Sequence, residues 1–126
     1  AQMISANLST AAFLDAKMGG INLEKANLDQ ARVIRCNLEN GQLSGMTSRQ
    51  SIWHLSQLHN AEVRGADFFQ ADLIGADLTG CDLRDSSFAR ARVDAMVREE
   101  AQYDETAFKL SRPDNETYAN HVLSSY

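Results

Sequence analysis

The sequence has few of the residues on which several common protein classes depend. Two cysteines among 126 residues are too few for a disulfide framework. Basic residues are also scarce, since 12 Lys and Arg stand against 17 Asp and Glu and give a formal net charge of -5. A basic face that neutralises phosphates is therefore missing, and we expect no direct nucleic-acid partner.

Long apolar runs are missing as well. No stretch approaches the roughly eighteen unbroken apolar residues that a membrane span requires, and no charged-then-apolar leader opens the chain. We therefore expect one soluble domain without a membrane partner, located in the cytoplasm or, as the alternative, within a secreted effector. Because the chain opens at Ala1, already inside a repeat, we also expect it to be a piece of a longer polypeptide.

A large apolar residue recurs at every fifth position, and the register is kept across one miss at Ser48. A small residue, most often alanine, stands two positions before most of these large residues. Cys36 and Cys81 occupy this small-residue position, so we interpret them as buried small hydrophobes. The apolar series is Met3, Leu8, Phe13, Met18, Leu23, Leu28, Val33, Leu38, Leu43, Trp53, Leu58, Val63, Phe68, Leu73, Leu78, Leu83, Phe88 and Val93.

A period of five fits neither the 3.6 of an α-helix nor the 2 of a strand, so it indicates a stacked repeat. The repeats read A-(D/N)-L-x-x, as in ANLST from Ala6, CNLEN from Cys36 and GADFFQADLIGADLTGCDLRD from Gly65 to Asp85. This pattern resembles the pentapeptide-repeat family, and the resemblance covers residues 1–96. It implies an all-β solenoid, a right-handed quadrilateral β-helix of about five coils of twenty residues each.

Four sides per coil predict four inward ladders of large residues along the axis. Residues 46–60 match the repeat poorly, with Ser48 and Trp53 at inward positions. We expect an irregular coil there, and a bulged loop of the same length is the alternative. Residues 97–126 are predicted to form an irregular last coil, weakly continued by Tyr103 and Phe108, and a helical cap. The helix, from residue 115 onward, is expected to lie across the last coil.

An aligned apolar stripe on the outer surface is the first candidate site. Twenty-residue spacing places Leu14, Ile34, His54 and Ile74 in one row of the third side. We expect this exposed stripe to contact a protein partner or a second copy in a homodimer. The alternative is that β-branched residues merely suit outer strand positions. The complete stripe adds flanking residues to the row and consists of Leu14, Ile34, Ile52, His54, Leu55, Phe69 and Ile74.

An acidic ring is the second candidate site, since Asp67, Asp72, Asp77 and Asp82 hold the same outward position in successive repeats. We interpret these residues as structural, with side chains bonded to the turn backbone. The family resemblance offers an alternative, acidic mimicry of DNA, as in the quinolone-resistance members that bind type II topoisomerases such as gyrase.

Catalytic and metal sites are not expected. Glu39 and His59 come close on neighbouring coils, but an acid-base pair needs a pocket, and a convex rod offers none. His54, His59 and His121 lack metal-ligand spacing, and no cofactor is implied. The sequence therefore predicts a non-enzymatic module that displays a rigid surface to a protein partner. The alternatives are a topoisomerase-binding DNA mimic and a binding or spacer domain of a larger secreted effector enzyme.

Overall fold

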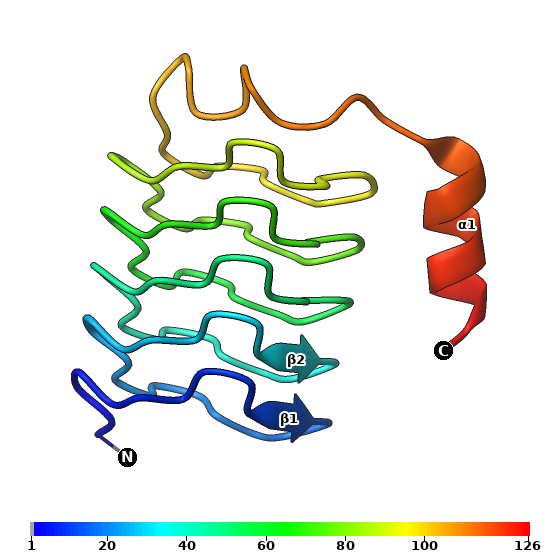
Figure 1. Cartoon of the computed structure of the whole chain (residues 1–126). Helices are drawn as coiled ribbons and strands as arrows, with labels where there is room; N and C mark the ends of the chain where they lie inside the picture. The colour runs from blue at the N-terminus through cyan, green and yellow to red at the C-terminus, as the bar shows by residue number, and fades with distance from the viewer. Residues whose placement is uncertain (1) are drawn as a thin grey trace.

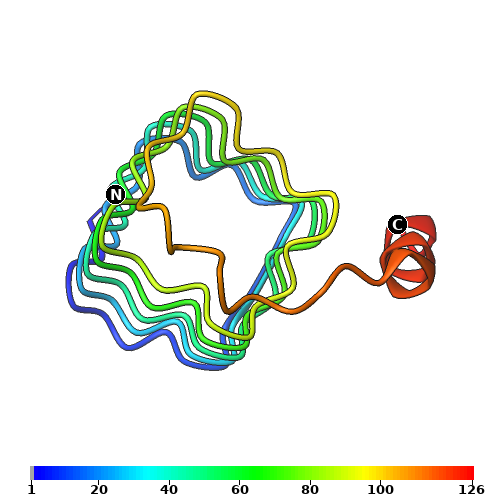
Figure 2. The ribbon, with the colours of Figure 1, turned by 90° about the horizontal axis from the view of Figure 1, so that it is seen from above.

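The chain winds into a four-sided rod, seen from the side in Figure 1 and along its axis in Figure 2. This computed structural model describes residues 2–126, so Ala1, the first residue of the predicted domain 1–96, lies outside the described residues. Residues twenty positions apart pair in parallel bridges. One such row runs through Gln2, Asn22, Gln42, Glu62, Asp82 and Gln102, so the pairing extends past the predicted boundary at residue 96.

Strands are short because each side of the square is only one repeat long. Strand β1 (Ala12–Leu14) pairs in parallel with β2 (Arg32–Ile34), with Phe13 opposite Val33. Elsewhere in residues 2–126 the pairing consists of isolated bridges between turns. The extended geometry of a β-helix is thus present with little continuous sheet.

Every corner of the square is a tight turn with a positive φ. Ala6 donates its N–H to the carbonyl of Met3, and Ser5 between them has a φ of 57°. The same geometry recurs every fifth residue, with glycine at Gly20, Gly45, Gly65, Gly75 and Gly80 and non-glycine residues at most other corners. Because a positive φ strains most residues, the stacked hydrogen bonds must hold these corners in place.

The predicted inward residues form the core. Leu23, Leu43, Val63 and Leu83 are fully buried along the first side. The aromatic residues of the second side stack, with Phe68 and Phe88 centroids 5.1 Å apart and Phe88 and Phe108 centroids 4.6 Å apart. Phe108 thus continues the ladder, as expected, and covers the C-terminal end of the rod.

Residues 46–60 form a coil that pairs with both neighbours, as predicted, and not a bulged loop. Thr47 bridges Asp67 and Gln57 bridges Asp77. The large Trp53 side chain is fully buried and donates its indole N–H to Ser48 Oγ at 2.8 Å. Ser48 is therefore small because Trp53 fills the space that a larger residue takes in other coils.

The C-terminal helix does not lie where the sequence interpretation placed it. Helix α1 (Glu116–Ser124) packs along the third side of the rod rather than across the last coil (Figures 1 and 2). The loop that carries Phe108 already covers the end, whereas the apolar stripe on the third side offers α1 a surface to bury. With nine residues α1 is too short to cross a bilayer, and residues 2–126 contain no helix that could.

Both cysteines are buried and free, as the sequence interpretation requires. The Cys81 thiol donates to the carbonyl of Leu58 at 2.8 Å. Burial raises the pKa of Cys81 to about 12 and also raises the pKa of Cys36. Both side chains therefore remain protonated thiols near neutral pH and act as small core residues.

Restoring the regular repeat at Ser48 is predicted to destabilise the rod. Ser48→Leu inserts a larger side chain next to Trp53 and removes one of the two hydroxyl acceptors of its indole N–H, while Ser51 Oγ at 3.0 Å remains. We therefore expect a loss of about 1–3 kcal/mol, mainly from overpacking. Urea denaturation measures the change. The double variant Ser48→Leu with Trp53→Leu should recover part of the loss, and a single variant as stable as the parent would contradict this account of the packing.

Candidate functional site

The third side of the rod carries a row of outward residues that ends in a carboxylate. Ile34, His54, Ile74 and Asp94 follow one another at the spacing of one coil, and all four are buried. Ile74 packs against α1, while Asp94 and His54 contact Asn115 and Tyr126, which flank the helix. We call the surface formed by these four residues the side-three groove.

The local sequence explains why α1 forms. Asn115 precedes the helix, and its side-chain oxygen accepts a hydrogen bond from the N–H of Tyr118 at 3.0 Å. This is the usual N-cap arrangement. Glu116 in the first turn and His121 in the last turn both suit the helix dipole. Yet a nine-residue helix is not stable alone in water, so its stability comes from the groove.

Apolar contact between α1 and the rod is centred on Ile74. Ile74 packs against Ala119 and Val122 in a buried cluster separate from the core of the rod, with Tyr118 and Leu123 at its edge. Gly75, at the adjoining corner, permits this approach, because a Cβ there would lie 3.0 Å from Leu123 Cδ2. The helix can therefore approach the rod closely because Gly75 has no side chain.

A polar network fastens both ends of α1 to the same coils. His54 Nδ1 lies 2.7 Å from the Tyr126 hydroxyl, and His54 Nε2 lies 3.0 Å from Asp72 Oδ2. The Tyr118 hydroxyl donates to Asp72 Oδ2 at 3.2 Å. Both tyrosine rings also face guanidinium groups, with Arg92 4.4 Å from the Tyr118 ring and Arg35 5.3 Å from the Tyr126 ring.

Asp72 is the acceptor on which this network converges. Burial acts to raise the pKa of its carboxyl, but the close His54 imidazole, the N–H of Ile74 and the Tyr118 hydroxyl outweigh burial. The pKa of Asp72 therefore lies below its usual value of 3.8. The ionised form of Asp72 is the one that stabilises the docked helix.

Asp94 binds the residue that precedes the helix, but only one of its two carboxylate oxygens has a hydrogen-bond partner among the described residues. Asp94 Oδ2 accepts a hydrogen bond from the N–H of Asn115 at 2.6 Å. Asp94 Oδ1 is buried and has no hydrogen-bond partner among the described residues. A hollow of about 320 Å³ next to it is lined by Asp94, Ala95, Ala119 and Leu123, among others. The hollow extends along α1 from Glu116 to Leu123, so the rod and the helix are not fully packed against each other beside Asp94.

The predicted exposed stripe needs a correction. Ile34, His54 and Ile74 are buried rather than exposed. Helix α1 covers Ile74, and Tyr126, two residues beyond the helix, contacts His54. Leu14 remains 54% exposed beyond the C-terminal end of the helix, while Ile52 and Leu55 are half-buried. Phe69 is separate from the groove, half-buried on the second side with the Arg49 guanidinium 4.9 Å from its ring. Only the part of the stripe around Ile74 is a contact surface, and its occupant is the chain's own helix.

Every carboxylate of the acidic ring is hydrogen-bonded to the backbone of the rod. Each Oδ1 accepts from the N–H two residues further on, as Asp67 does from Phe69 at 3.0 Å and Asp77 from Thr79 at 3.0 Å. Each Oδ2 also lies near a cationic or imidazole group. The four contacts are Asp67 with Arg49 at 3.6 Å, Asp72 with His54 at 3.0 Å, Asp77 with His59 at 2.6 Å and Asp82 with Arg84 at 2.7 Å.

These contacts lower the pKa of two further ring carboxyls. The hydrogen bond from Arg84 is the main cause of the lowered pKa of Asp82. For Asp77, burial acts to raise the pKa, but hydrogen bonds from Thr79 and His59 outweigh it. The lowered pKa values of Asp72, Asp77 and Asp82 thus favour ionised carboxylates that are engaged with groups of the rod.

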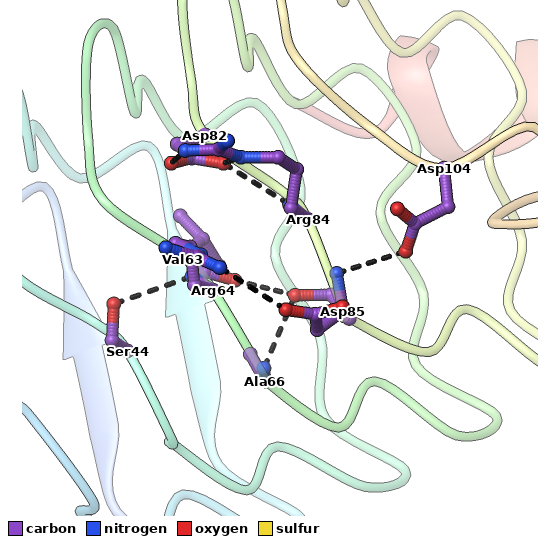
Figure 3. A network of polar contacts seen from close by, with 9 residues as sticks. Ser44, Val63, Arg64, Ala66, Asp82, Arg84, Asp85 and Asp104 are labelled. Atoms are coloured by element: carbon purple, nitrogen blue, oxygen red, sulfur yellow. Dashed lines mark hydrogen bonds and ion pairs between the residues drawn. The ribbon is translucent and has the colours of Figure 1, made fainter.

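The first side carries exposed ion pairs rather than a cluster around a cavity. Figure 3 shows Arg84 paired with Asp82, Arg64 with Asp85, and the N–H of Asp85 bonded to Asp104. Arg64 Nη2 lies 3.3 Å from Asp85 Oδ2, and both side chains are more than half exposed. Exposed pairs of this kind contribute little to stability.

Glu39 and His59 do approach each other, with His59 Nδ1 3.8 Å from Glu39 Oε1. The side chain of His59 is 38% exposed and that of Glu39 is 44% exposed, so both face solvent on the outer surface. Residues 2–126 contain no group of three or more His, Cys, Asp or Glu side chains placed to hold a metal ion.

Sequence reasoning missed Asp94, Tyr118 and Tyr126 as members of the site. Asp94 continues the row of Ile34, His54 and Ile74 at the same twenty-residue spacing, so the period could have found it. The tyrosines had no comparable signal, because their partners lie 46 and 72 residues away in the sequence.

Acidification is predicted to release α1 from the groove. Because the folded pKa of Asp72 lies below 3.8, its stabilising effect is present above about pH 4 and is lost as the pH falls through the folded value. Amide hydrogen exchange of residues 116–124 should therefore accelerate below pH 4, after correction for intrinsic exchange. Asp72→Asn should exchange faster already at neutral pH and lose this step, and equal protection in both proteins would contradict the role of Asp72.

Comparison with solved structures identifies the fold. A structure of a pentapeptide repeat protein (Rfr23) from the cyanobacterium Cyanothece 51142 superposes with a TM-score of 0.67 at 17% identity, covering 90% of this chain and 91% of that one. A trypsin-treated form of QnrB1, a plasmid-mediated fluoroquinolone resistance protein, superposes with a TM-score of 0.63 at 11% identity, covering 79% of this chain and 61% of that one. At such identities the likeness establishes the fold alone, a right-handed quadrilateral β-helix.

Sequence comparison agrees with this fold. No curated protein matches the chain. The family model of pentapeptide repeats matches residues 1–45 and 54–89 with 8 copies, and the intervening gap coincides with the irregular coil around Trp53. Since this match covers more than half of the chain, the protein belongs to the pentapeptide-repeat family.

Proposed function

We propose that this rod of about five coils and its docked helix form a non-enzymatic module that presents a rigid surface to a protein partner. The observation that carries the proposal is the bridging of every coil to the next, which fixes outward side chains at constant spacing. A surface that is ordered before binding loses little conformational entropy in the complex. The groove on side three supports the proposal further, because it already binds a helix.

An enzymatic role has little support from the geometry. The nearest acid-base pair, Glu39 and His59, faces solvent, whereas general acid-base catalysis needs a site that excludes water and shifts pKa values. A role in the recognition of another protein uses what the rod offers, four sides with side chains at fixed spacing.

DNA mimicry is the second candidate, favoured by the acidic ring and by the fold likeness to QnrB1. Mimicry requires carboxylates that are free to meet the partner's cationic groups in place of phosphates. In the ring each carboxylate accepts a backbone N–H and lies near Arg or His of the same rod. The ring therefore fits a structural role better than a phosphate-like one.

Photo-crosslinking tests the interaction module. A photoreactive amino acid placed at Gln42, Arg49, Leu55 or Gln57 of the full chain samples the four sides in turn. In the cell that produces the protein, we expect one protein species to be captured, and mainly from one or two adjacent sides. Absence of any crosslink, or equal and diffuse labelling from all four sides, would contradict a specific partner surface.

A supercoiling assay separates the two candidates. We expect the full chain to leave DNA supercoiling by gyrase unchanged at low and at moderate ionic strength. Mimicry instead predicts inhibition that weakens as salt rises. If inhibition occurs, Asp67→Asn with Asp82→Asn serves as the matched variant, because asparagine keeps the turn bond, as Asn27 and Asn37 do. Salt-dependent inhibition that this variant loses would overturn the preferred function.

A further inference from the structure

The docked helix and the rod are separable parts of the molecule. The cluster of Ile74, Ala119 and Val122 is distinct from the core inside the rod, which contains no residue of α1. Release of α1 would therefore leave the inward ladders intact. It would expose the apolar outer surface of Ile74 together with His54, a condition that favours rebinding of a helix.

The fit between α1 and the groove is incomplete. Asp94 is 6% exposed, and its Oδ1 finds no partner among the described residues although Oδ2 is bonded to the N–H of Asn115. The hollow of about 320 Å³ is lined by Asp94 and Ala95 on the rod and runs along α1 from Glu116 to Leu123. A buried, unpaired carboxylate oxygen is costly, so a helix that brings a donor to it gains affinity relative to α1.

The helix seated in the groove also shows which chemistry the groove accepts. Two tyrosines eight residues apart, Tyr118 and Tyr126, reach Asp72 and His54 with their hydroxyl groups. Their rings face Arg92 and Arg35. Between them, Ala119 and Val122 supply a narrow apolar contact with Ile74. A competing helix needs the same narrow apolar stripe and the same pair of aromatic hydroxyls.

We propose that the side-three groove is the docking site for an amphipathic helix of a different protein, and that α1 is the occupant which this helix displaces. The inference rests on the proposed function and names its site and the chemistry of its partner. The partner helix carries small apolar residues flanked by two hydroxyl-bearing aromatic residues, and a hydrogen-bond donor that meets Asp94 Oδ1. A second copy of this chain fits less well, because its α1 would leave that oxygen unpaired as it is here.

The mechanism is competition between a tethered and a free helix. Tethering gives α1 a high effective concentration at the groove, so the wild-type chain binds an added helix weakly. Val122→Glu places a charge in the buried contact on the helix and leaves every groove residue unchanged. The full chain with this substitution therefore presents an empty groove on an intact rod.

Binding of a labelled synthetic peptide of residues 113–126 tests the groove. Fluorescence anisotropy measures the binding. We expect saturable binding to the Val122→Glu chain and binding at least about tenfold weaker to the wild-type chain. Adding Ile74→Asp to the Val122→Glu chain should weaken binding by at least about tenfold, because Ile74 is the centre of the apolar contact. A peptide with Tyr118→Phe and Tyr126→Phe should bind several-fold more weakly.

A donor at the helix start tests the role of Asp94. Four peptides place a donor in the first turn of the helix, with Glu116→Lys, Glu116→Gln, Thr117→Lys or Thr117→Gln. At least one of them should bind several-fold more tightly than the parent peptide. The gain should disappear when Asp94→Ala is added to the Val122→Glu chain. If no donor-bearing peptide gains affinity, the unpaired oxygen does not select the partner, and a helix from a different protein is no longer favoured.

Three further results would overturn the proposal. The first is the absence of saturable peptide binding to a Val122→Glu chain whose circular dichroism and thermal unfolding show an intact rod. The second is peptide binding that Ile74→Asp leaves unchanged. The third is a concentration-dependent dimer of the wild-type chain that Val122→Glu abolishes in analytical ultracentrifugation, because it would assign the groove to a second copy.

The photo-crosslinking experiment distinguishes failure of this inference from failure of the proposed function. Capture of a partner from Leu55, at the edge of the groove, should increase several-fold when α1 is released by Val122→Glu. Capture only from Gln42, Arg49 or Gln57, unchanged by that substitution, would retain the interaction module and reject the groove as its site.

Discussion

Hydrogen bonding between residues one coil apart is the constraint on which the structure depends. Leu43 donates its N–H to the carbonyl of Glu62 at 2.7 Å, and Gln42 donates to the carbonyl of Ile21 at 2.9 Å. The same pairing recurs on all four sides. It holds corner residues such as Ser5 at a positive φ that an isolated chain would seldom adopt. It also leaves a narrow interior, which is why alanine and cysteine fill the small-residue position.

The outer surface follows from the same constraint. Because successive coils are in register, outward residues form rows, and any row can become a contact surface if its members are apolar. On the third side the row is covered by α1, whereas the acidic ring is held by backbone N–H groups and by neighbouring Arg and His side chains. The protein therefore combines a rod that is ordered throughout with one helix held by a small contact and a few polar bonds.

The period predicted the rod and its core because the inward residues, Ser48 excepted, follow one local rule. Leu23, Leu43 and Val63 are buried as the count requires, and even the irregular Trp53 keeps its place. The position of α1 could not be predicted in this way. Both the apolar row and the apolar face of the helix were visible in the sequence, but nothing local shows that Tyr126 meets His54 across 72 residues. The positive φ at corners such as Arg35 and Gln50 was also hidden, because most corners lack glycine.

Amide hydrogen exchange of the inward ladder tests the central claim most directly. Leu43 and Val63 donate to the next coil at 2.7 and 2.8 Å, so their amides should exchange only when the whole rod unfolds. The account predicts slow exchange with the same free energy of opening at both residues, equal to the global free energy of unfolding from denaturant titration. Rapid exchange at either residue under native conditions would contradict a rod held together by bonds between coils.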